Sequence, residues 1–141
     1  MKIKAGTSLY HGTDADFDEE CDGLQGPAWL SSSIDVAEYF AKRSGGWGAE
    51  KRVIEYRLIR DIDLPDIYSV REMQDFAEKH GICLAGVEDM KETVEASGIP
   101  GWVLPNNYPN GDDILIVDTG FLEYVSTVKL EPALTMGMRP V

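Results

Sequence analysis

The stretch Asp113-Ile114-Leu115-Ile116-Val117 is a continuous apolar run that follows a carboxylate. A short run of this kind is typical of a strand in the interior of a β-sheet, and we predict a central strand here. After it, apolar and polar residues alternate over 122–130, which predicts a final strand. Before it, Trp102-Val103-Leu104 predicts another strand, and a turn-rich insert over 105–111 joins it to the central one.

The first half of the chain contains three further strand signals. Residues 7–11 are predicted to form a short strand that Gly12 ends, and residues 28–31 a second one. Alternating apolar and polar residues over 52–64 predict the longest strand of the protein. The acidic, glycine-containing segment 14–27 is predicted to be a loop.

Three helices are predicted between the strands. A serine followed three residues later by an acid has the spacing of a capping box, and this pattern predicts helix starts at Ser32 and Ser69. The first helix is predicted to stop in the glycine-rich segment 44–48, the second at Gly81, and a third at Gly98. Short antiparallel strands with helices packed outside them predict an α+β fold.

The length and the cysteine count limit the class of protein. A chain of 141 residues fits one domain over 1–141. Its two cysteines, Cys21 and Cys83, do not make a disulfide framework. With only two histidines, His11 and His80, and no Cys-x-x-Cys pair, we expect no metal site.

The formal net charge of −12 restricts the partners of this protein. Binding to nucleic acid through its phosphates needs clustered lysine and arginine, whereas the basic residues here are scattered and residues 14–22 are acidic. The charge therefore disfavours nucleic acid as a direct substrate. The charge either solvates the surface or steers the protein towards a basic protein partner.

No targeting or membrane segment is visible in the sequence. The N-terminal Met1-Lys2-Ile3-Lys4 is basic but no apolar segment follows it, as a signal peptide would require. No apolar run approaches the roughly 18 residues needed to span a bilayer. We therefore expect a cytoplasmic protein without a membrane partner.

His11 and Gly12, at the end of the first strand, are the first candidate site residues. A histidine followed by glycine can present both its imidazole and an uncovered backbone to a ligand. The alternative is a structural histidine that caps the strand end or packs on Tyr10.

The second candidate is the segment from Trp29 to Ala41, where aromatic residues flank a helix start. Aromatic faces hold a flat, positively charged ring by stacking and cation–π attraction, and Tyr39 is the candidate for this role. The alternative is that Trp29, Tyr39 and Phe40 are core residues, which is our interpretation of Phe40.

The third candidate is the pair Asp112-Asp113 at the start of the predicted central strand. A carboxylate in that position can oppose positive charge that develops at a reacting centre. The alternative is a solvated hairpin turn, because Asn110-Gly111-Asp112-Asp113 has a common turn composition.

In this order and spacing, the three candidates resemble the ADP-ribosyltransferase superfamily. The similarity runs from Leu9 to about Leu130 and rests on Tyr-His-Gly-Thr at 10–13, Trp-Leu-Ser-Ser-Ser at 29–33 with Val-Ala-Glu-Tyr-Phe-Ala after it, and the acid that opens the apolar strand. The closer match is the histidine–tyrosine–acid branch, which includes diphtheria toxin and the poly-ADP-ribose polymerases. Small phage-borne members, such as an anti-CRISPR ADP-ribosyltransferase, are similar in size.

The resemblance implies a split antiparallel β-sandwich with flanking helices and NAD bound as substrate. It assigns His11 to the nicotinamide-side ribose, Tyr39 to stacking on the nicotinamide ring, and Asp113 to the catalytic acid. Most members have a glutamate at the acid position, and Asp112 and Glu123 are the alternatives to Asp113. Trp29 or Leu30 stands where the family has its first tyrosine. The implied NAD contacts are His11, Gly12, Thr13, Trp29, Ser31 and Tyr39.

The resemblance implies a mono-ADP-ribosyltransferase that modifies a basic protein target, as a phage or bacterial effector would. An NAD glycohydrolase, with water as the acceptor, would use the same residues. The other alternative is a non-catalytic acidic module that binds or inhibits a partner on the same fold.

Overall fold

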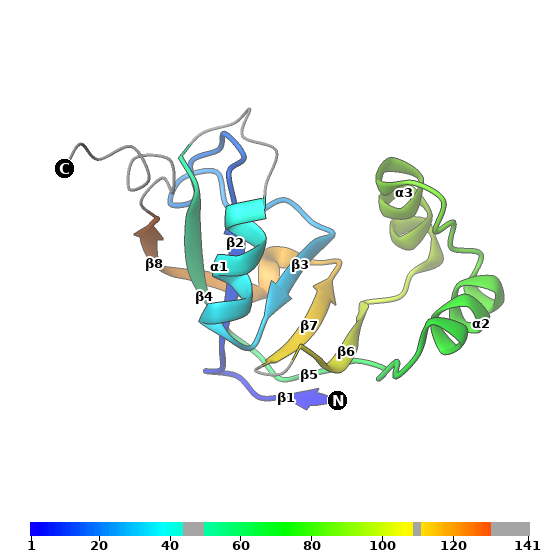
Figure 1. The fold of residues 1–141 in the computed structure, drawn as a ribbon. Coiled ribbons are helices and arrows are strands. Elements are labelled where there is room, and N and C mark those ends of the chain that lie inside the picture. The colour runs from blue at the N-terminus through cyan, green and yellow to red at the C-terminus, as the bar shows by residue number, and fades with distance from the viewer. Residues whose placement is uncertain (44–49, 109–110, 131–141) are drawn as a thin grey trace.

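The computed structural model describes residues 1–43, 50–108 and 111–130. Within them, a six-stranded antiparallel sheet in the order β6-β7-β3-β2-β4-β8 is accompanied by the two-stranded sheet β1-β5 and by three helices (Figure 1). The α+β prediction is confirmed. No helix in the described ranges is long and apolar enough to cross a membrane.

The bounds of the elements follow from their hydrogen bonds. The large sheet contains β6 (Gly101–Tyr108), β7 (Gly111–Ile116), β3 (Ala28–Ser31), β2 (Ser8–Thr13), β4 (Arg52–Leu58) and β8 (Leu122–Lys129). The small sheet contains β1 (Lys2–Ile3) and β5 (Ile62–Asp63). The helices are α1 (Ile34–Arg43), α2 (Val70–His80) and α3 (Val87–Ser97), and a short 3₁₀ turn, Thr119–Phe121, precedes β8.

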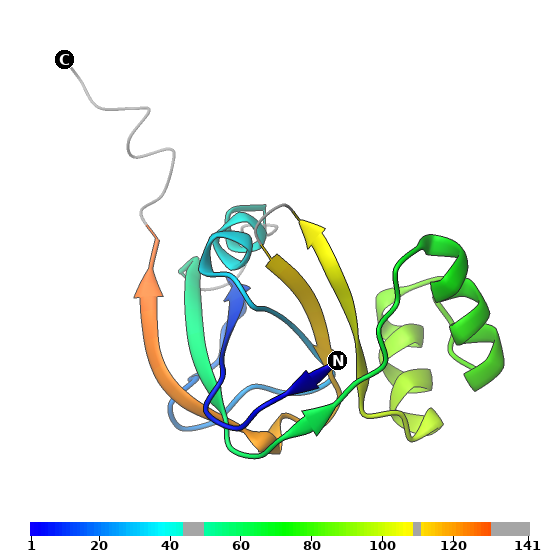
Figure 2. The same ribbon diagram turned by 90° about the horizontal axis from the view of Figure 1, so that it is seen from below.

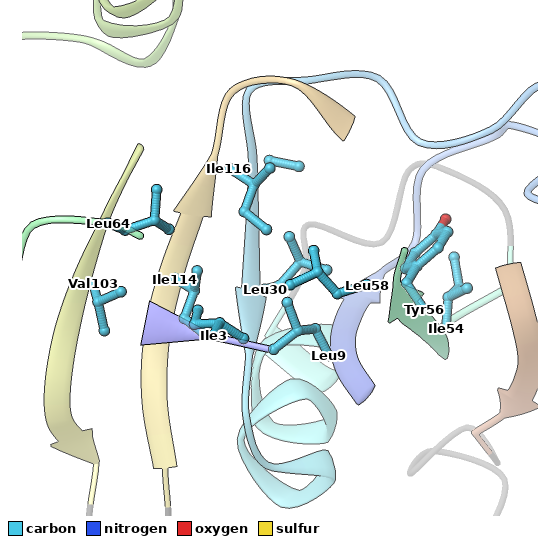
Figure 3. Close-up of a cluster of buried hydrophobic side chains, with 11 residues drawn as sticks. Ile3, Leu9, Leu30, Ile54, Tyr56, Leu58, Leu64, Val103, Ile114 and Ile116 are labelled. Atoms are coloured by element: carbon cyan, nitrogen blue, oxygen red, sulfur yellow. The ribbon is translucent and has the colours of Figure 1, made fainter. Parts of the chain in front are cut away.

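The main core fills the space between one face of the curved large sheet and β1 (Figure 2). Side chains alternate along a strand, so every second residue of β2, β3, β4 and β7 points into this space. Ile3 of β1 packs against them (Figure 3). The fully or nearly buried members of this core include Leu9, Leu30, Ile54, Tyr56, Leu58, Leu64, Val103, Ile114 and Ile116.

A second core lies on the opposite face of β6 and β7, under α2 and α3. Trp102 and Leu115, which neighbour Val103 and Ile114 in their strands, form one hydrophobic cluster with Ala77 of α2 and Val94 of α3. The central position of β7, between β3 and β6, confirms the strand predicted over 113–117. Because both of its faces are covered, the sequence there is apolar without alternation.

The predicted strand over 52–64 is wrong in its length. β4 ends at Leu58, and the chain turns before β5 begins at Ile62. The Ile59 side chain, the apolar exception to the alternation, is 54% exposed. Ile62 pairs with Ile3, so β5 joins the small sheet and does not prolong the large one.

The predicted insert over 105–111 is also corrected. β6 continues through Tyr108, but its register with β7 shifts after Leu104, so that three residues of β6 oppose one of β7. Such a bulge bends the strand and re-aims its side chains. Asn106 takes a left-handed conformation there (φ 53°), and its N–H donates to Asp112 Oδ1 at 2.7 Å.

The predicted helix start at Ser32 is wrong, whereas the one at Ser69 is confirmed. α1 begins at Ile34, and the Ser32 hydroxyl accepts a hydrogen bond from the Asp112 N–H, at 2.9 Å. Ser69 is the N-cap of α2, where its hydroxyl accepts from Glu72 N–H at 3.1 Å.

The helix ends are predicted correctly where the structure describes them. Gly81 and Gly98 follow α2 and α3 in the left-handed conformation, with φ of 69° and 75°, which glycine adopts without steric cost. The stop predicted over 44–48 lies outside the described residues.

Candidate active site

β2 and β3 separate after one paired position. They are joined at Tyr10 and Ser31, whereas β2 pairs with β4, and β3 with β7, along their whole lengths. Across the opening, His11 Nδ1–H donates to the Trp29 carbonyl oxygen at 2.7 Å. Because a carbonyl only accepts, Nδ1 carries the proton, and Nε2 of the neutral ring is the nitrogen that accepts from a ligand.

A cavity of ≈ 360 Å³ occupies this opening, beneath α1. Its volume lies in the range of small-molecule sites. Most of its walls are apolar, and its polar side chains are an imidazole, a carboxyl group, a phenol and a serine hydroxyl. It is lined by Tyr10, His11, Gly12, Trp29, Leu30, Ser31, Ala37, Phe40, Leu104 and Asp113.

Gly12 lets α1 lie close to the sheet and leaves the backbone open to the cavity. A Cβ atom at position 12 would lie 1.9 Å from the Ala37 carbonyl oxygen, so any side chain would displace the helix. Leu58 N–H donates to Thr7 O. In an antiparallel ladder this assigns the odd residues of β2 to β4, while the N–H and C=O of Tyr10 and Gly12 face the side of β3.

The electrostatic surroundings of His11 favour its neutral form. Burial lowers the pKa of His11 below its ordinary value, although the hydrogen bond to Trp29 opposes this effect. The positive charges of Arg52 and Lys91 lower the pKa further. The ring is therefore uncharged at neutral pH and acts as a hydrogen-bonding group.

Asp113 is a buried carboxyl group on the central strand. It lies between Ser31 of β3 and Leu104 of β6, and it is 7% exposed. Asn107 Nδ2 donates to its Oδ2 at 2.9 Å. Burial raises the pKa of Asp113; the Asn107 hydrogen bond opposes this shift and the charge of Asp112 adds to it. A carboxyl group with a raised pKa at a cavity wall is a candidate for chemistry.

The structure places the aromatic residues around the cavity differently from the sequence prediction. Phe40 lines the cavity and is 40% exposed, so its interpretation as a core residue is wrong. Tyr39 is 44% exposed, is not part of the lining, and has the Arg43 guanidinium 4.7 Å from its ring centroid. Trp29 lines the cavity and packs edge-on against Trp102, with ring centroids 6.0 Å apart.

A larger cavity of ≈ 850 Å³ adjoins the first, because His11 and Trp29 line both. Residues of loop 14–27 form most of its wall, and Lys91 of α3 lines it from another side. Loop 14–27 is thus part of the site.

Arg52 holds that loop in place. Its guanidinium donates to the carbonyls of Ala15 and Phe17, and it pairs with Glu19 at 3.2 Å. The side chains of Arg52 and Glu19 are only 6% and 15% exposed. Burial disfavours the Glu19 carboxylate, but its bonds to Arg52 and Thr127 hold the pKa of Glu19 below its ordinary value.

The remaining predicted residues lie at different distances from the opening. Ser31 lines the smaller cavity, and its hydroxyl accepts from Ser33 N–H at 3.1 Å. Thr13 lines the larger cavity. Asp112 accepts the hydrogen bond from Asn106 N–H in the bulge of β6. Glu123 is an exposed residue of the edge strand β8, opposite Arg57 and separated from β7 by three strands.

Comparison with known proteins supports the fold. No protein-family model matches the chain, and no curated protein matches its sequence. Among solved structures, it is similar to a chain in the crystal structure of the M. tuberculosis MbcT–MbcA toxin–antitoxin complex. The TM-score is 0.55 at 16% sequence identity, over 98% of this chain and 91% of that chain. At this identity the likeness shows a shared fold.

Sequence reasoning missed three residues of the site. Asn107 reaches Asp113 because the bulge re-aims it, and the sequence carries no signal for this contact other than a turn-rich composition. Arg52 has no sequence signal beyond its place at the start of a predicted strand, and buried arginines are rare and need partners. Lys91 comes from a helix that the sequence did not connect with the site.

Proposed function

We propose that this protein transfers ADP-ribose from NAD to a protein, with residues 1–141 acting as one unit. The observation that carries the proposal is that His11, with Nε2 available to accept a hydrogen bond, and the buried Asp113 line the same apolar cavity. A nicotinamide ring with its ribose matches this combination of aromatic walls and few polar groups. The resemblance of Tyr-His-Gly-Thr to the ADP-ribosyltransferases supports the same substrate.

The residues fit the chemistry of NAD cleavage. Breaking the bond between the ribose and the nicotinamide nitrogen gives an oxocarbenium-like centre, and nicotinamide leaves with the electron pair of that bond. The Asp113 carboxylate stabilises the positive charge and takes up the proton that the incoming nucleophile loses. His11 Nε2 accepts a hydrogen bond from a ribose hydroxyl, and the backbone of Gly12 binds the carboxamide.

A protein partner is supported by the fold, and a basic acceptor by the charge. The similar chain comes from a toxin–antitoxin complex, which favours a protein that a second protein binds. The net charge of −12 favours a basic target. Release of free ADP-ribose at the full rate without any protein would instead show an NAD glycohydrolase.

The first test is calorimetric titration with NAD of the wild type and of His11→Ala. The variant is expected to bind NAD at least about tenfold more weakly, because a hydrogen bond in a desolvated site is lost. Since burial keeps the pKa of His11 below its ordinary value of about 6.5, wild-type affinity is expected to stay constant from about pH 8 to 6.5 and to fall at lower pH, as the ring becomes protonated.

Absence of NAD binding by the folded wild type would refute the proposal. The same result for His11→Ala as for the wild type would remove His11 from the site. A search with labelled NAD for the modified protein follows a positive titration.

The ring that stacks on nicotinamide is tested by a matched pair of variants. Tyr39 is the residue that the resemblance assigns, but Phe40 is the one that lines the cavity. We therefore expect Phe40→Ala to weaken NAD binding by about tenfold, the loss typical of a stacked ring, and Tyr39→Ala to change it less than about twofold. Thermal unfolding of both variants is the control. The reverse order of effects would restore Tyr39 as the stacking residue.

A further inference from the structure

A positively charged side chain that has no role in the proposed reaction lines one of the two adjoining cavities. The larger one, ≈ 850 Å³, meets the smaller one at His11 and Trp29. Because the two cavities share His11 and Trp29, a dinucleotide whose nicotinamide ring and ribose occupy the smaller cavity can extend past His11 and place its diphosphate in the larger one. The diphosphate carries two negative charges at neutral pH, and the protein carries a net charge of −12.

Lys91 is the single lysine or arginine that lines either cavity within residues 1–43, 50–108 and 111–130. It is the fifth residue of α3, its side chain is exposed, and it forms no ion pair with any residue in those ranges. Its ammonium group is therefore available to a ligand.

The other charged residues of the larger cavity act against an anion. Asp16 and Asp22 line it as well, and their carboxylates repel a diphosphate. His11 contributes no positive charge, because burial lowers its pKa. Among the charged side chains that line this cavity in the described ranges, Lys91 is therefore the one that attracts an anion.

We propose that Lys91 binds the diphosphate of the dinucleotide and makes the site select a dinucleotide over an uncharged nicotinamide nucleoside. The inference rests on the proposed function. α3 contains none of the motifs on which the resemblance rests. The inference makes α3 the element that recognises the diphosphate, whereas the bond that breaks lies on the opposite side of His11.

The test compares NAD with nicotinamide riboside, which has the same ring and ribose but no phosphate. Calorimetric titrations of both ligands are made with the wild type, with Lys91→Glu, and with Lys79→Glu as a matched control, an exposed lysine of α2 that lines neither cavity. Lys91→Glu is expected to weaken NAD binding by about tenfold or more and to leave riboside binding within about twofold. Raising the ionic strength is expected to weaken NAD binding by the wild type more than by Lys91→Glu.

Three results would overturn the inference. Equal affinity of Lys91→Glu and the wild type for NAD would remove Lys91 from the site. An equal loss for NAD and the riboside would assign Lys91 a structural role. Wild type that binds neither ligand would refute the proposed function, and the inference with it, and this outcome is distinct from the first two because it requires no variant.

Discussion

Asp113→Asn is expected to reduce the rate of NAD cleavage by about 100- to 1000-fold and to leave NAD affinity within a few fold. In the proposed reaction the carboxylate acts on charge that develops only in the transition state, and loss of one such group typically has this cost. An amide at position 113 keeps the shape of the side chain, and its oxygen still accepts from Asn107 Nδ2, as Asp113 Oδ2 does at 2.9 Å. Single-turnover NAD cleavage, with calorimetry for binding, measures both quantities.

The same variant is expected to be more stable than the wild type at neutral pH. Because burial raises the pKa of Asp113 above the value in the unfolded chain, the folded state holds the proton more tightly, and stability falls as the pH rises through the folded pKa. An amide does not titrate, so the stability of Asp113→Asn does not fall in this way as the pH rises. A less active but more stable variant would exclude misfolding as the cause.

Two controls distinguish Asp113 from the other acids. Asp112→Asn and Glu123→Gln are expected to keep NAD cleavage within about threefold of the wild type, because Asp112 holds the bulge of β6 and Glu123 lies on the far edge strand. A large loss in either control, with Asp113→Asn active, would transfer the catalytic role to that residue.

Arg52→Met is expected to lower the free energy of unfolding by about 3–5 kcal/mol, the cost of leaving one partner of a buried ion pair uncompensated. Arg52 and Glu19 are 6% and 15% exposed, so solvent screens them little. The guanidinium also donates to Ala15 O and Phe17 O, which lose their partner in the variant. Urea unfolding at neutral pH measures the loss.

The double variant Arg52→Met/Glu19→Met is the control for this pair. Because it removes both charges, it is expected to recover a large part of the lost stability. In the wild type, the contribution of Glu19 is present above its unfolded pKa and disappears as the pH falls through its lowered folded pKa. A single variant as stable as the wild type would show that the pair is no stronger than an exposed one.

Local signals predicted the parts of the fold that depend on local physics. The helix start at Ser69 and the ends at Gly81 and Gly98 follow from capping within one turn of the chain. The central strand over 113–117 follows from an uninterrupted apolar run, which needs no knowledge of its partners. These elements depend on few residues outside themselves.

The errors arose where a distant residue decides the outcome. Ser32 has the spacing of a helix cap, but its hydroxyl binds the N–H of Asp112, which is 80 residues away. The strand after Leu58 leaves the large sheet because Ile3, from the start of the chain, pairs with Ile62. Neither contact has a sequence signal at the position that it changes.

The candidate site shows the same division. His11, Gly12, Trp29, Ser31 and Asp113 were predicted from short motifs, and the structure brings all five to one cavity. Tyr39 and Phe40 are adjacent in a helix and point about 100° apart, so periodicity alone did not decide which ring faces the cavity. The packing of Ala37 on Gly12 sets the rotation of α1.

In the strand order β6-β7-β3-β2-β4-β8, the cavity between β2 and β3 is completed late in synthesis. β7 lies between β6 and β3, and β8 pairs with β4. Both strands are synthesised after the other strands of the sheet. An incomplete chain holds His11 but has no strand to bring Asp113 beside it. β3 pairs with β7 across about 80 residues of the chain, and pairing over such long sequence separations is slow. A chain that ends before β7 therefore lacks the cavity that His11 and Asp113 line together.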